Sequence, residues 1–290
     1  MKALSEKTPS TATDPTLTAT VTGAVNSETL NYTLARANGE NAGTYAITVT
    51  LGSNPNYDVT ANNGTFKINK KAATVTVDNK SKVYREDDPE LTATVDGAVG
   101  NDTINYTLSR AEGENVGKYD ITVTLGENPN YNVTVNNAKL TIGKKAATVT
   151  ATDKSRTYGE NDPKLTATVE GTVGDDTINY TLSRTKGENV GEYSIKVNLG
   201  ENPNYDVTTV NGTFKITKKA ATVTADDLNK VYGEDDPELT ATVEGSVGDD
   251  TLNYTLSRAK GDNVGEYETK VTLGENPNYD VTTVNGTFKI

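Results

Sequence analysis

An internal repeat is the feature that most constrains how this chain can fold. Tyr84, Tyr158 and Tyr232 are equally spaced in the sequence, and the residues around them recur nearly unchanged. Length alone would allow one large domain of 290 residues, but this period indicates several small domains built on one plan. We predict four tandem domains at residues 1–69, 70–143, 144–217 and 218–290, the first with a truncated or degenerate first strand.

The clearest strand pattern within a copy lies in residues 187–216. From Tyr193 to Leu199, apolar side chains occupy every second position, which is the period of a half-buried strand. After a proline-containing turn, Asn211-Gly212 separates two short β-prone runs. Because Asn-Gly supplies the positive φ angles of a two-residue turn, we predict a hairpin here.

The predicted hairpin pairs Val210 with Thr213. Cross-strand neighbours in that register share one face of the sheet. The apolar face of the hairpin would comprise Tyr205, Val207, Thr209, Phe214 and Ile216.

The rest of a copy also predicts strands and no helix. In the fourth copy, Ala221, Val223 and Ala225 alternate with threonines, and further strands are predicted at residues 239–243 and 252–258. A polar loop, residues 226–237, separates the first two strands. We expect about six strands per copy and an all-β fold. An Ig-like β-sandwich and a β-grasp-like sheet both fit.

Composition excludes several classes of function. The chain has no Cys and no His, which removes disulfides, the usual zinc sites and catalysis by either residue. A formal charge of −12 argues against nucleic acid and anionic membranes as partners. No apolar run approaches the roughly 18 residues that span a bilayer, and no signal-peptide core follows Met1. We expect neither nucleic-acid binding nor membrane insertion.

The junctions between copies are short. Segments 142–146 and 216–220 leave no flexible linker, so we expect stiff joints and an elongated rod. In such a rod the first and last strands of a copy must run in the same direction. Each copy should then advance about 30 to 40 Å along the axis. Both ends of the sequence look cut, so we interpret the chain as a piece of a longer array.

The acidic loops 86–90 and 234–238 are the candidate sites for calcium, which carboxylate oxygens near a junction could hold. The alternative is a solvated turn, since the spacing matches no EF-hand loop and Lys164 replaces an acid in the third copy. Paired carboxylates also suit glycoside hydrolysis, but exposed turns repeated in every domain do not fit that chemistry. We predict no catalytic, cofactor-binding or metal-binding residues and no enzyme activity.

Two further features concern lysines and tyrosines. A Lys–Asn isopeptide bond needs a buried lysine beside an acid, and only the junction lysines, such as Lys70 and Lys71, recur regularly. We therefore expect no such bond. We assign Tyr193 and Tyr205 to the core, whereas Tyr232, outside any clean strand, could equally fill a domain junction.

Three motifs resemble a known repeat. They are Tyr-Gly-Glu-Asx-Asp-Pro-Xaa-Leu-Thr-Ala-Thr-Val at 158–169 and 232–243, Asn-Val-Gly-Glu-Tyr, and a closing Asn-Gly-Thr-Phe-Lys-Ile. They look like the MBG-type domain, YGX variety, found in tandem in large bacterial cell-surface and adhesin-like proteins. The resemblance covers essentially the whole chain. The sequence departs from the motif at Arg85 in the second copy and at Ser10-Thr11 in the first.

The resemblance implies a location at the bacterial cell surface, secreted or wall-associated, and brings no catalytic residues. We predict a structural stalk or spacer of a bacterial surface adhesin that projects a distal binding region from the cell. The rival is a module that binds host glycan or host protein through many weak sites, and a repeated apolar surface patch would favour it. The expected partners are adjacent repeats of the same chain, with any host ligand bound outside this sequence, and we expect a monomer.

Overall fold

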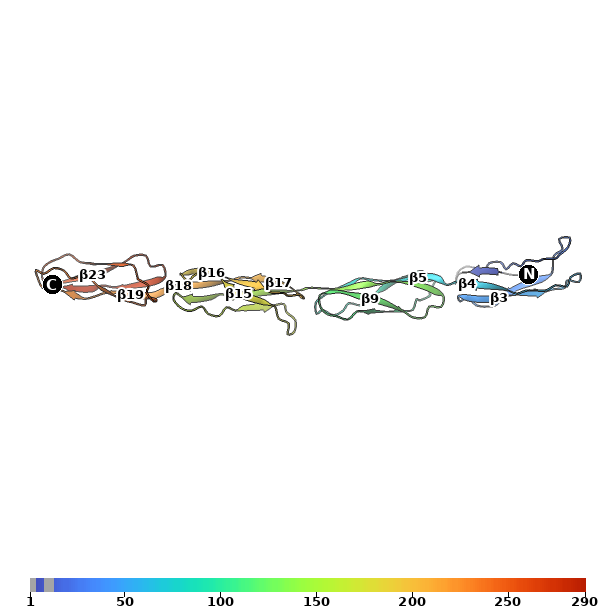
Figure 1. The fold of residues 1–290 in the computed structure, drawn as a ribbon, viewed down its shortest axis with the longest axis horizontal. Helices are drawn as coiled ribbons and strands as arrows, with labels where there is room; N and C mark the ends of the chain where they lie inside the picture. The colour runs from blue at the N-terminus through green and yellow to red at the C-terminus, as the bar shows by residue number, and fades with distance from the viewer. Residues whose placement is uncertain (1–3, 8–12) are drawn as a thin grey trace. The chain divides into compact units, whose positions relative to one another are not determined.

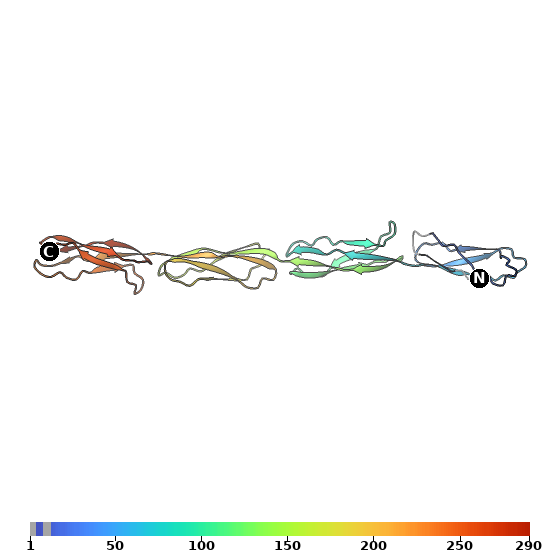
Figure 2. The same cartoon turned by 90° about the horizontal axis from the view of Figure 1, so that it is seen from above.

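The computed structural model describes residues 4–7 and 13–290, and every helix or strand assigned in them is a β-strand. Neither Figure 1 nor the view turned by 90° in Figure 2 shows a helix in this part of the chain. The all-β fold class is therefore confirmed. By its contacts the chain separates into two units, residues 1–144 and 145–290, and each holds two copies of the repeat. Ser10 and Thr11, where the first copy departs from the motif, lie outside the described residues.

The third repeat, in the second unit, illustrates the plan. Its two sheets have the strand orders β14-β12-β17 and β13-β18-β16-β15. Side chains of both sheets meet in a core that includes Ala151, Ile195 and Phe214. The repeat is thus a β-sandwich. Its strands are β12 (Lys145–Ala151), β13 (Lys154–Thr157), β14 (Ala167–Glu170), β15 (Tyr180–Arg184), β16 (Gly191–Leu199), β17 (Tyr205–Val210) and β18 (Gly212–Thr217).

The second and fourth repeats have the same sheets. The second comprises β5 (Lys71–Val77), β6 (Lys80–Val83), β7 (Ala93–Asp96), β8 (Tyr106–Arg110), β9 (Gly117–Leu125), β10 (Tyr131–Asn136) and β11 (Ala138–Gly143). The fourth comprises β19 (Lys219–Ala225), β20 (Leu228–Asn229), β21 (Ala241–Glu244), β22 (Tyr254–Arg258), β23 (Glu266–Leu273), β24 (Tyr279–Val284) and β25 (Gly286–Lys289).

The first repeat forms a single four-stranded sheet in the described part of the chain. Its order is β1-β4-β3-β2, and β1 pairs in parallel with β4 as β13 pairs with β18. Among the described residues it has no strand that corresponds to β12. The strands are β1 (Leu4–Lys7), β2 (Tyr32–Arg36), β3 (Gly43–Leu51) and β4 (Gly64–Ile68).

Alternation along the first strand of a full repeat builds the core as predicted. Ala221, Val223 and Ala225 are buried, whereas Thr222 and Thr224 between them are half-buried. Small and β-branched side chains suit this strand, because it lies between two neighbours, β21 and β24, and faces the opposite sheet.

The first two strands of a full repeat pair in parallel with its last two, β12 with β17 and β13 with β18 in the third repeat. Lys145 pairs with Tyr205 at one end, and Lys154 pairs with Phe214 further along, so a single register offset holds in both sheets. Repeats two and four have the same offset. The prediction that the first and last strands share a direction is confirmed.

The predicted Asn211-Gly212 hairpin is wrong. Strands β17 and β18 do not pair with each other, because β17 lies beside β12 and β18 beside β13 and β16. The dipeptide carries the chain from one sheet to the other, and neither of its residues has a positive φ. Asn211 Oδ1 accepts the N–H of Val197 at 3.2 Å.

The predicted face of that hairpin is consequently split between the two sheets. Tyr205 enters the core from β17, whereas Phe214 and Ile216 enter it from β18, and Thr209 is exposed. The chain passes from one sheet to the other twice, between β12 and β13 and between β17 and β18. The two crossings are bonded to each other, because Asp153 in the first accepts the Thr213 N–H at 2.7 Å through Oδ1. Non-local parallel pairing therefore decides the register here.

Each full repeat has seven strands where about six were expected. The extra strand, β6, β13 or β20, lies in the predicted polar loop and pairs in parallel with the last strand. Its sequence is polar, as in the Lys80–Val83 run, so periodicity alone did not indicate a strand.

The loop that follows Tyr84, Tyr158 and Tyr232 has the same backbone conformation in the second repeat, although Arg85 replaces glycine there. Gly159 and Gly233 have φ of +81° and +90°, and Arg85 adopts φ of +64° at the same position. The Arg85 guanidinium lies 5.4 Å from the Tyr84 ring centroid, which compensates part of the cost of a left-handed arginine. In the described part of the chain, no helix is long and apolar enough to cross a membrane.

Candidate functional site

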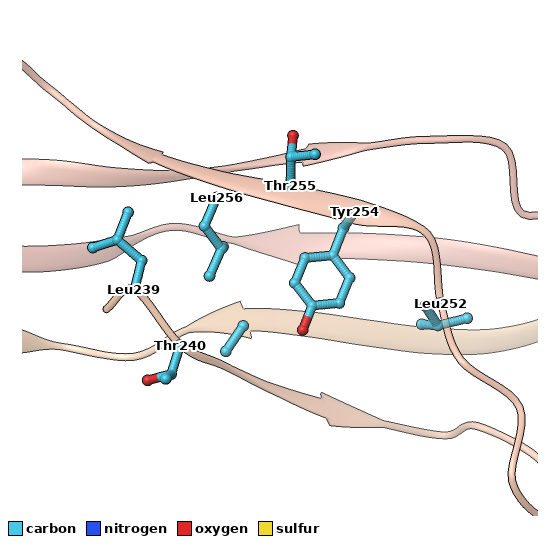
Figure 3. Close-up of a pocket in the computed structure, with 7 residues that line it drawn as sticks. Leu239, Thr240, Leu252, Tyr254, Thr255 and Leu256 are labelled. Carbon is cyan, nitrogen blue, oxygen red and sulfur yellow. The ribbon is translucent and has the colours of Figure 1, made fainter. Parts of the chain in front are cut away.

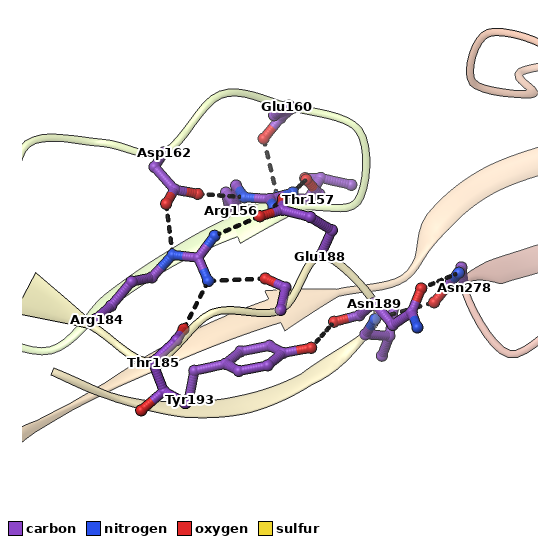
Figure 4. Close-up of polar contacts among 12 residues, drawn as sticks. Arg156, Thr157, Glu160, Asp162, Arg184, Thr185, Glu188, Asn189, Tyr193 and Asn278 are labelled. Carbon is purple, nitrogen blue, oxygen red and sulfur yellow. Dashed lines mark hydrogen bonds and ion pairs between the residues drawn. The ribbon is translucent and has the colours of Figure 1, made fainter.

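Arg184, the last residue of β15, is the centre of a polar cluster (Figure 4). Its Nε donates to Asp162 Oδ2 at 2.5 Å, and Nη2 donates to Glu188 at 2.8 Å. Nη1 donates to the carbonyl oxygens of Thr185 and Gly187 at 2.9 and 2.7 Å. One side chain thus fixes the loop after β15 and the loop that carries Asp162.

A second cation, Arg156 of β13, completes the cluster. Its Nε donates to Asp162 Oδ1 at 2.7 Å, and its Nη2 pairs with Glu188. The side chain is only 3% exposed. Two arginines and two carboxylates therefore neutralise one another, which is what allows guanidinium groups to lie against the core.

The Arg184 guanidinium also packs on aromatic rings. It lies 5.6 Å from the Tyr193 ring centroid and 4.9 Å from that of Phe214. The Tyr193 hydroxyl donates to the Asn189 carbonyl oxygen at 2.7 Å, so its ring is held in the loop between β15 and β16 (Figure 4). Tyr193 packs on the core and Tyr205 is buried in it, which confirms both assignments.

The cluster recurs along the chain. In the second repeat Lys82 replaces Arg156 and lies 2.6 Å from both Asp88 and Glu114. In the fourth repeat Lys230 lies 2.6 Å from Asp236. The central arginines of the four repeats are Arg36, Arg110, Arg184 and Arg258, and each pairs with two carboxylates.

Ion pairing shifts the pKa values of the cluster. Hydrogen bonds from Arg258 and Lys230 lower the pKa of Asp236 to about 2. The pKa values of Asp88 and Asp162 are lowered in the same way, chiefly by Arg110 and Arg184. These carboxylates therefore stay ionised across the physiological range.

The acidic loops considered for calcium contribute their carboxylates to this cluster. Asp88 and Asp236 are each held by two cations. Residues 13–290 contain no group of three or more acidic side chains arranged to hold a metal. The solvated-turn alternative is incomplete too, because one acid of each loop is an ion-pair partner.

A buried lysine beside an acid does exist, which the sequence analysis missed. Burial lowers the pKa of Lys82, but hydrogen bonds from its ammonium group to Asp88 and Glu114 outweigh that effect and leave the pKa raised. Amide formation needs a neutral amine and a protonated acid, and the pKa values of Lys82 and Asp88 move the other way. The geometry therefore supports an ion pair.

A second recurring site joins neighbouring repeats within each unit. Asn278 Oδ1 accepts the Val190 N–H at 2.9 Å, and Asn278 Nδ2 donates to Asn189 Oδ1 at 3.1 Å (Figure 4). In the first unit, Asn130 makes the same two bonds to Ala42 and Asn41, at 2.9 and 3.0 Å. In both units, therefore, the last asparagine of an Asn-Pro-Asn-Tyr turn bonds to the preceding repeat.

Tyr158 adds a larger contact between the third and fourth repeats. Its hydroxyl donates to Asp250 Oδ2 at 2.9 Å, and the Tyr279 hydroxyl donates to the same oxygen at 2.5 Å. The two rings meet edge to face, with centroids 5.4 Å apart. Burial and Asp250 raise the pKa of Tyr279 to about 12.

Gly159, next to Tyr158, lies against Val247 of the fourth repeat. A Cβ at residue 159 would approach Val247 Cγ2 to 2.5 Å, so a larger residue would force the repeats apart. The sequence allowed a junction role for Tyr232; its counterpart Tyr158 has that role, while Tyr232 is 65% exposed.

An open groove with a mixed polar and apolar lining lies between the sheet edges β21 and β22 of the fourth repeat (Figure 3). Leu239, Tyr254 and Leu256 line it. The third repeat has the same groove, lined by Leu165, Tyr180 and Leu182. This is a surface feature repeated by copy, of the kind that would favour a binding module.

The β-sandwich fold of the repeats and the recurring contacts between neighbouring repeats within a unit define a tandem all-β repeat protein. The family model of the MBG domain, YGX type, matches residues 6–67, 73–141, 147–215 and 221–289. The chain therefore belongs to the MBG family, and the resemblance stated from the sequence is confirmed. The repeat limits predicted above differ slightly from these matches and stay a prediction.

Solved structures resemble the chain only weakly. A three-domain fragment (EC1-3) of Drosophila N-cadherin is 13% identical, covers 73% of this chain and 96% of its own, and gives a TM-score of 0.26. Three N-terminal domains of the outer capsid protein Hoc of bacteriophage RB49 are 12% identical, cover 90% and 99%, and give 0.24. Scores this low carry no argument. No curated protein matches the sequence.

Proposed function

We propose that these MBG repeats are the structural stalk of a bacterial surface adhesin. They would lie outside the cell, project a distal binding region from it and have no catalytic activity. The observation that supports this most is the parallel pairing of the first two strands with the last two in each full repeat. Because these strands share a direction, the chain enters a repeat at one end and leaves at the other, so each repeat adds its length.

The same pairing suits a stalk under tension. In the third repeat, six residue pairs join β12 to β17 and four join β13 to β18. Pulling the two ends apart loads these backbone hydrogen bonds in shear, so that they resist together and do not open one by one. The Arg156–Asp162 ion pair adds a side-chain interaction at the end of β13.

The joints favour stiffness. Only Lys218 separates β18 from β19, and two residues, 69 and 70, separate β4 from β5. Linkers this short, together with the Asn278 and Tyr158 bonds, restrict bending between neighbours within a unit.

Small-angle X-ray scattering of the whole chain tests the stalk. At about 30 to 40 Å per repeat, the chain would have a radius of gyration of roughly 40 Å, against about 19 Å for a globule of this length. Inserting Gly-Gly-Ser-Gly after Thr217 should lower the value by freeing one joint. A radius near that of a globule, or no response to the insertion, would refute the proposal.

A second candidate function rests on the groove shown in Figure 3. Because its leucines and tyrosine recur in the third and fourth repeats, weak sites for host glycan or host protein could act together. A glycan array and a mucin pull-down with the chain decide between the two functions. Under the spacer proposal nothing binds. Binding that is lost in the double variant Tyr180→Ser with Tyr254→Ser would replace the spacer by the binding module.

A further inference from the structure

The strands β8, β15 and β22 each end the four-stranded sheet of their repeat, with one neighbouring strand among the described residues. In the fourth repeat, Asn253 and Ala259, which flank β22, make backbone hydrogen bonds of 2.9 and 2.8 Å on the β23 side. Bonded and outward-facing residues alternate along such a strand, so the N–H and C=O groups of Tyr254 and Leu256 point away from β23. We call this outward side of β8, β15 and β22 the free edge.

The other sheet edges of a repeat carry features that limit pairing with further strands. In the third repeat, β14 has only four residues and ends at the charged Glu170. The edge strand β13 carries Lys154 and Arg156, and β17 carries Asp206. Short length and charged side chains both protect an edge. In β15 the first four residues are uncharged, and Arg184 is neutralised by two carboxylates, so the free edge is the least protected.

The groove of Figure 3 lies beside the free edge. Tyr254 and Leu256 line it from β22, and Leu239 lines it from the segment that leads into β21 (Figure 3). Directly opposite residues of two paired strands share one face of the sheet. A strand added to β22 would therefore hold every second side chain over the groove. The site fits an extended segment with apolar residues at alternate positions.

Charge selects among such segments. The exposed acids Glu238 and Glu244 lie at the two ends of β21, beside the groove. Arg258, at the end of β22, is neutralised by two carboxylates. The whole chain has a formal charge of −12. A cationic segment is therefore attracted, whereas an acidic segment or a second copy of this chain is repelled.

We propose that the free edge binds an extended cationic segment of a partner protein, which joins the sheet as an antiparallel strand. Leu256 and Tyr254 each exchange N–H and C=O hydrogen bonds with the residue opposite, whose apolar side chain covers the groove. Lysines or arginines at the intervening positions lie on the outer face, beside Thr255 and Ser257. The inference rests on the second candidate function, because it uses the same groove, and it is independent of the stalk.

The third and fourth repeats should bind such a segment with different strength. Lys164 lines the groove of the third repeat at the position that Glu238 has in the fourth. The fourth repeat should therefore bind a cationic segment more tightly. An edge of five residues forms an interface well below the standard size, so a Kd on the order of 0.1 to 1 mM is expected.

Titration of the intact chain with a short capped peptide of alternating lysine and valine is the test, read by fluorescence anisotropy. N-methylation of the valines removes the N–H groups that face β22 and should weaken binding by about tenfold or more. N-methylation of the lysines, whose N–H groups point away, should leave binding unchanged. Glutamate in place of lysine should also abolish binding at low salt.

Amide hydrogen exchange followed by NMR locates the bound peptide. The outward amides of Tyr254 and Leu256 should gain protection, whereas those of Thr255 and Ser257, already bonded to β23, should change little. Protection confined to residues outside β8, β15 and β22 would overturn the proposal. So would equal binding of both N-methylated peptides, which would indicate charge attraction alone.

Surface variants test the role of charge. Glu238→Lys should weaken binding at the fourth repeat several-fold, and Lys164→Glu should strengthen it at the third. The matched control, Lys215→Glu, makes the same change in net charge on β18, which β16 separates from the free edge, and should leave binding at the third repeat unchanged. A glycan bound at the groove with no peptide binding would overturn this inference and leave the second candidate function standing. Scattering of the chain without peptide tests the stalk separately.

Discussion

The third and fourth repeats have the same strands in the same order, yet one core position changes from an apolar to a polar residue. Ile195 of β16 is fully buried in the third repeat. Thr269 of β23 takes its place in the fourth, is equally buried, and its Oγ1 has no hydrogen-bond partner among the described residues. The strand pattern therefore fixes which position is buried, while the residue there sets how stable that repeat is.

The polar clusters of these two repeats differ as well. Glu188 reaches both Arg156 and Arg184, whereas Asp262, one methylene shorter, reaches only Arg258, at 3.3 Å. The strand beside the cluster has four residues in the third repeat, β13, and two in the fourth, β20. We infer that the fourth repeat is the less stable of the pair, and four predictions test this comparison.

Exchanging the core residues should have the largest effect. Ile195→Thr should destabilise the third repeat by about 2 to 4 kcal/mol, because it removes apolar volume and buries an unpaired hydroxyl. Thr269→Ile should stabilise the fourth by about 2 kcal/mol. Hydrogen exchange read by mass spectrometry on peptides of each repeat measures both.

Thr269→Val is the control for that exchange. It keeps the volume and removes only the hydroxyl, so it should still slow hydrogen exchange in the fourth repeat. Unchanged protection would show that the Thr269 hydroxyl finds water or another partner, and that the two repeats differ for another reason.

Acid should have the second-largest effect, by weakening the polar cluster of the fourth repeat. Asp236 has a pKa of about 2 in the folded chain against 3.8 ordinarily. Because the folded value lies below the unfolded one, the stability contributed by Asp236 is complete above about pH 4 and is lost as the pH falls towards 2. The urea midpoint of the fourth repeat should therefore be flat from neutral pH to about pH 5 and fall below about pH 4. Asp236→Asn should flatten this fall at low salt, and an identical profile would contradict the assignment.

Local patterns predicted the strands but not all of their partners. Period-two alternation located Ile195 and Ala221–Ala225 correctly, because one face of each strand is buried. The Asn211-Gly212 pattern predicted the wrong structure because β17 and β18 pair in parallel with β12 and β13, which lie at the start of the same repeat in the sequence. This non-local pairing overrides the local turn preference. The second repeat held a warning, since Ala138 stands where that turn would need glycine.

The polar cluster was missed for a related reason. Its cations, Arg156 and Arg184, are well separated in the sequence and meet only when β13 and β15 join the same sheet. The available signal was a basic residue two positions before each motif tyrosine, at Lys82, Arg156 and Lys230. The joint was partly foreseen, because Tyr232 was considered for such a role and Tyr158 has it.

Removing the hydroxyl should have different effects at Tyr158 and at Tyr232. Tyr158→Phe loses the bond to Asp250 and should weaken the contact between the third and fourth repeats by about 1 kcal/mol. Tyr232→Phe should leave the stability of a dilute sample unchanged, since this side chain is exposed. Hydrogen exchange at Val190 and Val247 is the measurement, and equal effects of the two substitutions would contradict the assigned role.

Lengthening one acid should have the smallest effect. Asp262→Glu would let the carboxylate reach Lys230 as well as Arg258, as Glu188 reaches Arg156 and Arg184. Because the group is at the surface, a gain of only about 0.3 to 1 kcal/mol is expected, and salt should reduce it. The reciprocal change, Glu188→Asp, should lower the stability of the third repeat by a similar amount. If neither change alters protection of β13 or β20, the shorter β20 must have a cause other than Asp262, and the weakness of the fourth repeat would rest on Thr269 alone.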